Sequence, residues 1–299
     1  MKLLDVINDF MVHCRFKDLS RHTLRAYDRD LKDYRLWFSR SGRRNPFEKH
    51  SILAWVEDMR TRNLAPASVK RRVACLRAMF RWLEQEERLD ENPFHKLHTL
   101  VRLPRKLPRN LTSAELRLIF ETSELRRVGQ DNPELATLAL SLELLLATGI
   151  RVGELCSITV GDIDLEAGNI RIRGKGNRER NVYIVDSELH QQITVYMTLR
   201  SRHGARGTGL LFSSGGGKVD PGYIRKMIHD FVGKLPLDRK VTPHMFRHTA
   251  ATRLLERGVD IRFVQKLLGH ASISTTEIYT HVSDRQLRTV VEMASPRRI

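Results

Sequence analysis

Five side chains in the second half of the sequence have the chemistry needed to act on a phosphodiester. Arg151 follows the segment TGI, HMFRHTAAT carries His244 and Arg247, and LLGHASISTTEIYTH carries His270 and Tyr279. A phosphodiester anion repels nucleophiles until its charge is neutralised, and preorganised cations do this most effectively. Arginines can bind its non-bridging oxygens in bidentate fashion, and a phenol can then attack the phosphorus to form a covalent phosphotyrosine. The set therefore predicts metal-free chemistry on a phosphodiester, with Tyr279 as the nucleophile.

A tyrosine alone would not support this prediction, because most helical tyrosines are core residues. The phenol of tyrosine has a reference pKa of about 10, so attack near neutral pH needs a base and nearby positive charge. The arginine and histidine side chains around Tyr279 could supply both.

A further segment, GKGNRER, begins at Gly174 and places Lys175 in a glycine-flanked turn. A phosphate-binding P-loop needs G-x-x-x-x-G-K-[ST] followed by a helix, whereas Asn177 follows this turn and leads into a strand. The turn therefore does not imply ATP. A lysine between glycines is often an ordinary turn residue, and only the other segments give Lys175 a possible catalytic role.

The segment at His244 also allows a zinc interpretation, because His244 and His248 lie four residues apart. The metalloprotease pattern H-E-x-x-H needs glutamate at its second position, where this chain has Met245. We therefore expect no metal site, and we expect His248 to pack or hydrogen-bond in the core. His244 and Arg247 should share one face of a helix that begins at Pro243 and should point outward.

Taken together, these segments resemble the tyrosine recombinase (phage integrase) family, and they are most similar to its compact Xer-type and integrase members. The family patterns T-G-x-R-x-x-E, G-K-G, H-x-x-R-H, L-G-H and Y-T-H all occur here in the same order. One such motif is weak evidence, but their conjunction is highly specific.

The resemblance implies a role for each matched residue. Arg151 and Arg247 would clamp the scissile phosphate, and Tyr279 would attack it. Lys175 would protonate the leaving 5′ oxygen, while His244 would act as general base.

Two further matched residues would support this group. His270 would donate a hydrogen bond to the phosphate, and Glu154 would orient its neighbours. The expected enzyme is a site-specific recombinase that exchanges strands between two DNA duplexes through a 3′-phosphotyrosine intermediate, with no cofactor and no metal. The expected partner is double-stranded DNA with an inverted-repeat core site, bound by a homotetramer or heterotetramer on two duplexes.

Charge supports a nucleic acid partner. The 299 residues include 52 Lys and Arg against 35 Asp and Glu, a net charge of +17. Such an excess attracts polyanions, and the basic residues are dispersed along helix-like segments. A membrane surface would fit the charge as well, but no segment has the large apolar moment of an interfacial anchor.

Targeting and redox signals indicate a cytoplasmic, nucleoid-associated protein. Asp5 interrupts the N-terminus before a signal-peptide core can form, and Glu143 breaks the longest apolar stretch, so we expect neither secretion nor membrane spanning. Three separated cysteines predict reduced thiols and no disulfide framework. They are Cys14, Cys75 and Cys156.

Apolar periodicity predicts four helices in the first hundred residues, the second of them capped by Ser20. Their other faces are basic. Any single charge there is most simply a solvated helix face, but in aggregate these faces suit phosphate contacts that set register on a duplex. The candidate DNA-binding residues are Arg21, Arg25, Lys70, Arg71, Arg72 and Arg77.

The pattern breaks where prolines mix with basic residues, which is typical of a linker. We expect a helical core-binding domain over 1–92, a linker over 93–110 and a catalytic domain with a C-terminal tail over 111–299. In the latter, the sequence predicts a capping box at Thr112 and Glu115 and a hairpin over 168–184. Further predicted helices are Pro133–Thr148, Ser187–Leu199, Tyr223–Phe231, Met245–Leu255, Ile261–Leu267 and Thr275–Val282.

The expected fold is mainly α with a small β-sheet. The resemblance adds that the first domain is a four-helix SAM-like unit, that the second is mixed α+β, and that the two form a C-shaped clamp around DNA. The tail beyond Tyr279 could fold on its own domain or dock on a neighbouring protomer. Competing functions are a type IB topoisomerase, which nicks and reseals one duplex, and a non-catalytic DNA-binding regulator.

Overall fold

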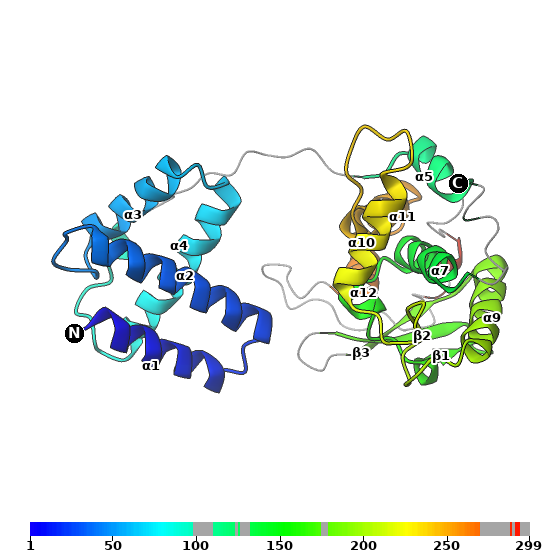
Figure 1. Ribbon diagram of the computed structural model, residues 1–299, viewed down its shortest axis with the longest axis horizontal. Coiled ribbons are helices and arrows are strands. Elements are labelled where there is room, and N and C mark those ends of the chain that lie inside the picture. Colours follow the sequence, from blue (N-terminus) through cyan, green and yellow to red (C-terminus); the bar gives the residue numbers. More distant parts are fainter. Residues whose placement is uncertain are drawn as a thin grey trace. The chain divides into compact units, whose positions relative to one another are not determined.

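The computed structural model (Figure 1) describes residues 1–97, 110–122, 125, 132–174, 179–269, 288 and 291–293. The chain divides into two compact units, Met1–Lys106 and Leu107–Ile299. Each unit has its own cluster of buried apolar residues. A separate core is what lets a domain fold as a unit, so the chain has two domains. The finer limits 1–92, 93–110 and 111–299 stay predictions.

The first unit is helical, as predicted, and its helices run from blue to cyan in Figure 1. Ser20 caps the second helix, because its hydroxyl accepts a hydrogen bond from the backbone N–H of Thr23 at 3.2 Å. The core forms around Tyr34, Trp55 and Phe80, each at most 1% exposed. The elements are α1 (Leu3–Phe16), α2 (Arg21–Arg40), α3 (Lys49–Thr61), α4 (Pro66–Gln85) and the 3-10 helix η1 (Pro93–Lys96).

The second unit surrounds a helix that is apolar on nearly every side. This helix, α7 (Pro133–Thr148), packs against four other helices, and Figure 1 places it at the middle of the unit. A helix that is hydrophobic all round is a buried one. The other helices are α5 (Ser113–Phe120), α8 (Val152–Leu155), η2 (Val160–Asp162), α9 (Ser187–Arg202), α10 (Pro221–Val232), α11 (Pro243–Glu256) and α12 (Ile261–Leu268).

A three-stranded antiparallel sheet of order β1-β2-β3 lies in the same unit. The predicted hairpin is present as β2 (Asn169–Arg173) and β3 (Glu179–Tyr183), with Ile170 opposite Val182. The sequence did not predict β1 (Ile163–Asp164), which has too few residues to show an alternating pattern. The mainly α fold with a small sheet is confirmed.

Local signals at the start of this unit are confirmed as well. Thr112 and Glu115 form the predicted capping box, in which each side chain accepts a hydrogen bond from the other residue's backbone N–H. The predicted helix Thr275–Val282 lies outside the described residues.

Candidate active site

A tight turn after α7 carries the first candidate catalytic residue. Gly149 ends this helix with φ of 64°, a conformation that glycine adopts without steric cost. A Cβ atom at Gly149 would lie 2.5 Å from Cδ2 of Leu268. The turn therefore lets the chain pass close under the end of α12 before it reaches Arg151.

Arg151 is fixed by Glu154, three residues later in the short helix α8. Its backbone N–H donates to Oε2 of Glu154 at 2.9 Å, and its Nη1 donates to Oε1 at 2.8 Å. Its Nη2 donates to the carbonyl of Gly269 at 3.2 Å. The side chain stays 40% exposed, so Arg151 is held in place and still open to a ligand.

Arg247 reaches the same place from α11. Its Nη1 donates to the carbonyl of Gly149 at 2.7 Å, and its Nη2 donates to the carbonyl of Leu268 at 2.8 Å. The residue is only 6% exposed, so the prediction that it points outward is wrong. Burial, followed by repulsion from the Arg151 guanidinium, lowers the pKa of Arg247 to about 10, which still leaves it protonated at neutral pH.

The two histidines of α11 lie on its exposed side. His244 and His248 are both exposed, four residues apart and therefore on one stripe. The prediction of an outward His244 is confirmed, and that of a core position for His248 is wrong. The cause is that Arg247, Met245 and Phe246 occupy the buried side of this helix.

A third arginine, which sequence reasoning missed, completes the group. Arg180 on β3 donates from Nη1 and Nη2 to the two carboxylate oxygens of Glu154, at 3.1 and 2.8 Å. Its Nε donates to the carbonyl of Leu267 at 2.8 Å. A signal was present in the sequence, because Arg180 is in phase with the buried Val182 on the strand and a charge on that face needs a partner.

All three arginines bind carbonyl groups at the end of α12, and Arg151 and Arg180 also share the carboxylate of Glu154. Burial acts to raise the pKa of Glu154, but hydrogen bonds from Arg180 and Arg151 outweigh it and lower the pKa. Glu154 is therefore ionised, and three guanidinium groups surround a single negative charge. The surplus of positive charge makes this place suitable for an anion.

Three further predicted catalytic residues, Lys175, His270 and Tyr279, lie outside the described residues. In the sequence, Lys175 falls between β2 and β3, and His270 directly follows Gly269. The structure thus brings Arg151, Glu154 and Arg247 together, and the assignment of the other residues stays a prediction.

The predicted DNA-binding residues of the first unit fall into two groups. Arg21, Arg25 and Lys70 are exposed. The other three have intramolecular contacts: Arg71 pairs with Asp30, Arg72 pairs with Asp33, and the guanidinium of Arg77 lies 5.2 Å from the centre of the Phe94 ring. These contacts leave DNA binding by all six residues as a prediction.

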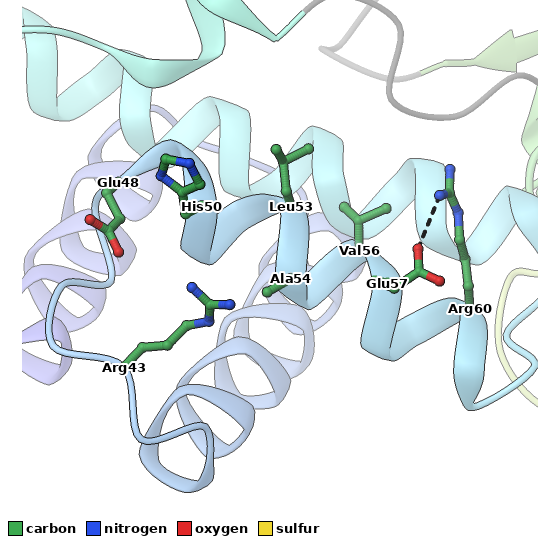
Figure 2. Close-up of a pocket in the computed structure, with 8 residues that line it drawn as sticks. All are labelled: Arg43, Glu48, His50, Leu53, Ala54, Val56, Glu57 and Arg60. Carbon is green, nitrogen blue, oxygen red and sulfur yellow. Dashed lines mark hydrogen bonds and ion pairs between the residues drawn. The ribbon is translucent and has the colours of Figure 1, made fainter.

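A hollow of about 670 Å³ opens beside α3 in the first unit. Figure 2 shows its lining, in which Arg43, Glu48 and His50 lie at one end and the ion pair of Glu57 with Arg60 at the other. The charges are mixed, and none of the candidate catalytic or DNA-binding residues lines it. Its lining therefore gives no reason to place the chemistry there.

In the described part of the chain, no three His, Cys, Asp or Glu side chains are grouped so that they could hold a metal ion. No helix within the same ranges is long and apolar enough to span a membrane.

Comparison with known proteins gives matches along most of the chain. Residues 109–286 match the model of the phage integrase family, and residues 8–87 match that of the phage integrase N-terminal SAM-like domain. The tyrosine recombinase XerC of Listeria monocytogenes is 35% identical, and XerD of Halalkalibacterium halodurans is 33% identical. Each alignment covers 94% of both chains.

Solved structures share the fold. The Tn1549 transposon integrase in complex with transposon right end DNA has a TM-score of 0.74 at 22% identity, over 98% of this chain and 99% of the other. The XerH site-specific recombinase bound to its difH substrate has a TM-score of 0.66 at 22% identity, over 92% and 80%. With the family model matching more than half of its residues and relatives above 30% identity along nearly all of its length, this chain belongs to the phage integrase family of tyrosine recombinases.

Proposed function

We propose that the chain is a site-specific DNA recombinase in which Arg151 and Arg247 clamp the scissile phosphate while Tyr279 attacks it. One observation supports this above the others. Two guanidinium groups from sequence motifs far apart in the chain meet at the end of α12, where both donate to the carbonyl of Leu268, at 3.5 and 2.8 Å. Rigid cations at one point are what a phosphodiester requires before a nucleophile can approach it.

Arg247 and Arg151 would bind the phosphate in different ways. Arg247 is fixed by two carbonyl groups and is nearly buried, so it is a cation whose position is set before DNA arrives. Arg151 is more exposed and is held at one side by Glu154, so its guanidinium is accessible to a non-bridging oxygen. Both remain charged, and neither has to be reorganised during the reaction.

Two of the remaining groups, His244 and Lys175, transfer protons. His244, exposed on α11 beside Arg247, accepts the proton of the Tyr279 phenol as the phenolic oxygen bonds to phosphorus. The bond from phosphorus to the 5′ oxygen breaks, and Lys175 supplies the proton that makes a free 5′ hydroxyl. His270 donates a hydrogen bond to the phosphate. The products are a 3′-phosphotyrosine and a free 5′ hydroxyl.

Rejoining is the same reaction in reverse. A 5′ hydroxyl from a second duplex attacks the phosphotyrosine, and the phenol leaves with its proton restored. Because the phosphotyrosine keeps the energy of the phosphodiester bond, this exchange of strands needs no nucleotide hydrolysis.

The partner is double-stranded DNA with an inverted-repeat core site. The net charge of +17 supports this, and so do fold relatives that were solved with a core site, with a substrate site or with transposon DNA. We infer that the two units close around the duplex and that four protomers act on two duplexes in the cytoplasm, at the nucleoid. The tail beyond Tyr279 is then either folded on its own unit or exchanged between protomers.

The test is a nicked suicide substrate, which lets the 5′ product diffuse away and so traps the covalent protein–DNA complex. A core site can first be selected from genomic DNA with the Tyr279→Phe protein, which should bind and not cleave. The unaltered chain should form an adduct with that site, and Tyr279→Phe should form none. An adduct of undiminished yield in the variant would overturn the assignment, and relaxation of plasmids lacking the site would favour the topoisomerase instead.

A further inference from the structure

Arg180 donates three side-chain hydrogen bonds beside the candidate active site, although none of the matched motifs gives it a role. Its side chain is 14% exposed. It joins three segments of the second unit, because it starts on β3, binds Glu154 of α8 and binds the last turn of α12. Those segments flank, in the sequence, Lys175, Arg151 and His270.

Glu154 has no spare capacity once Arg180 is bound. Its Oε1 accepts from Nη1 of Arg151 and Nη1 of Arg180, and its Oε2 accepts from the backbone N–H of Arg151 and Nη2 of Arg180. A carboxylate offers about four lone-pair sites, and all are used. Since Arg180 takes half of them, the hold of Glu154 on the Arg151 guanidinium is limited to one hydrogen bond.

The end of α12 is fixed by the same side chain. The last carbonyl groups of a helix lack partners within it and favour nearby cations. Here Arg180 takes the carbonyl of Leu267, Arg247 takes that of Leu268, and Arg151 takes that of Gly269. Gly269 has φ of 63°, and a Cβ there would lie 3.0 Å from Nη1 of Arg180, so backbone and guanidinium are in close contact.

We propose that Arg180 is a positioning residue for the cleavage reaction. It shares the charge of Glu154 so that Arg151 faces the phosphate, and it holds the helix end against which Arg247 is fixed. It need not contact DNA. This inference rests on the proposed function, because the two arginines are taken as the phosphate clamp.

The decisive experiment separates the rate of chemistry from DNA affinity. With a nicked suicide substrate at saturating protein, Arg180→Ala should lower the single-turnover rate of adduct formation by roughly 10- to 100-fold, since a small misplacement of a catalytic group has an effect of this size. The Kd for the same DNA should change little. Without Arg180, Glu154 is free to take a second hydrogen bond from Arg151 and turn it from the phosphate.

A second substitution tests whether the effect passes through Glu154. In a Glu154→Gln background the side chain at position 154 attracts Arg151 less strongly. Adding Arg180→Ala there should lower the rate of adduct formation by a smaller factor than it does in the unaltered chain, so the combined reduction should be less than the product of the two single reductions. Arg180→Lys keeps the charge and loses the paired donors. Its rate of adduct formation should therefore lie between those of the unaltered chain and Arg180→Ala. Arg200→Ala is a matched control, because Arg200 in the same unit also binds backbone carbonyl groups, at Gly207 and Gly209, and should leave the rate unchanged.

Other outcomes would overturn the proposal. A weaker Kd with a reduced salt dependence and an unchanged saturating rate would mean that Arg180 binds a DNA phosphate itself. Losses that multiply across Glu154→Gln, or an equal loss in Arg200→Ala, would mean a general effect on folding. A crystal structure of Arg180→Ala gives a readout without activity: Arg151 and the end of α12 unmoved would refute the inference even if the unaltered chain cleaved no DNA.

Discussion

Each unit contains a buried carboxylate that binds arginine, and the two behave in opposite ways. In the first unit, burial raises the pKa of Asp30 although Arg71 pairs with it. In the second unit the pKa of Glu154 is lowered despite similar burial. Asp30 is 1% exposed and Glu154 is 7% exposed, so exposure does not explain the difference.

The difference lies in the number of hydrogen bonds. Both oxygens of Glu154 accept two each, whereas Oδ1 of Asp30 is buried and accepts none from the described part of the chain. A buried charge is stabilised only when its hydrogen-bonding capacity is satisfied. The Asp30 pair is therefore a modest structural contact, and the Glu154 cluster is a preorganised charged site.

The largest effect is expected on the rate of cleavage, when an arginine of the second unit and one of the first are each replaced by lysine. Arg247→Lys keeps a positive charge but loses the two fixed nitrogens, Nη1 and Nη2, that donate to the carbonyls of Gly149 and Leu268. We expect the rate of adduct formation on a suicide substrate to fall by roughly 100- to 1,000-fold, the usual effect of removing one preorganised donor. Arg62→Lys is the control, since Arg62 forms ion pairs with Asp33 and Asp58 in the first unit.

That control should leave the rate of adduct formation at saturating DNA unaltered. If Arg247→Lys were equally active, the fixed geometry of the guanidinium would be irrelevant, and the phosphate clamp would have to be sought elsewhere.

A smaller effect concerns stability and its dependence on pH. Glu154→Gln removes a charge that accepts four hydrogen bonds from Arg151 and Arg180, so it should lower the free energy of unfolding at pH 7 by about 2 kcal/mol. Because the folded pKa of Glu154 is lowered, its contribution is present above its unfolded value near 4.5 and is lost as pH falls through the folded pKa. The difference between the unaltered chain and the variant should therefore shrink in acid.

Asp30→Asn should show the opposite slope. The folded pKa of Asp30 is raised above 3.8, so between these two pKa values the folded state binds more protons than the unfolded state. Stability of the unaltered chain relative to Asp30→Asn should then increase as pH falls through that window. Denaturant unfolding over a pH series measures how the stability difference between the unaltered chain and each variant changes with pH. Changes of the same sign for the two variants would show that the two carboxylates are not distinguished by their hydrogen bonds.

The sequence predicted the elements whose signals are local. The four helices of the first unit, the serine cap of α2, the capping box of α5 and the extent of α7 each depend on residues close in the sequence, and each is present. Arg151 and Arg247 were found as cations able to bind a phosphodiester, and Glu154 was found through the resemblance to the family patterns.

What the sequence did not predict depends on contacts between distant segments. Arg180 binds Glu154 and Leu267, and no local pattern tells which carbonyl or carboxylate a strand arginine will meet. Likewise, helical spacing placed Arg247 and His244 on one face, but the packing of α11 against α7 decides which of them is buried. The two-residue strand β1 depends on its pairing with β2 and has no sequence pattern of its own.

The smallest expected effect compares two glycine turns, one in each unit. Gly42 and Gly149 have φ of 66° and 64°, so an alanine is strained at both, by about 1 kcal/mol. A Cβ at Gly42 meets nothing within 4 Å, whereas one at Gly149 would collide with Leu268, whose carbonyl binds Arg247. We expect Gly42→Ala to lower the free energy of unfolding by about 1 kcal/mol and Gly149→Ala by about 2 kcal/mol, because overpacking adds to the strain.

Only Gly149→Ala should also slow adduct formation, since a shift of Leu268 would also shift the guanidinium of Arg247. Equal losses of stability with unchanged rates would mean that Leu268 yields freely, and that the close approach of the turn to α12 does not set the position of Arg247.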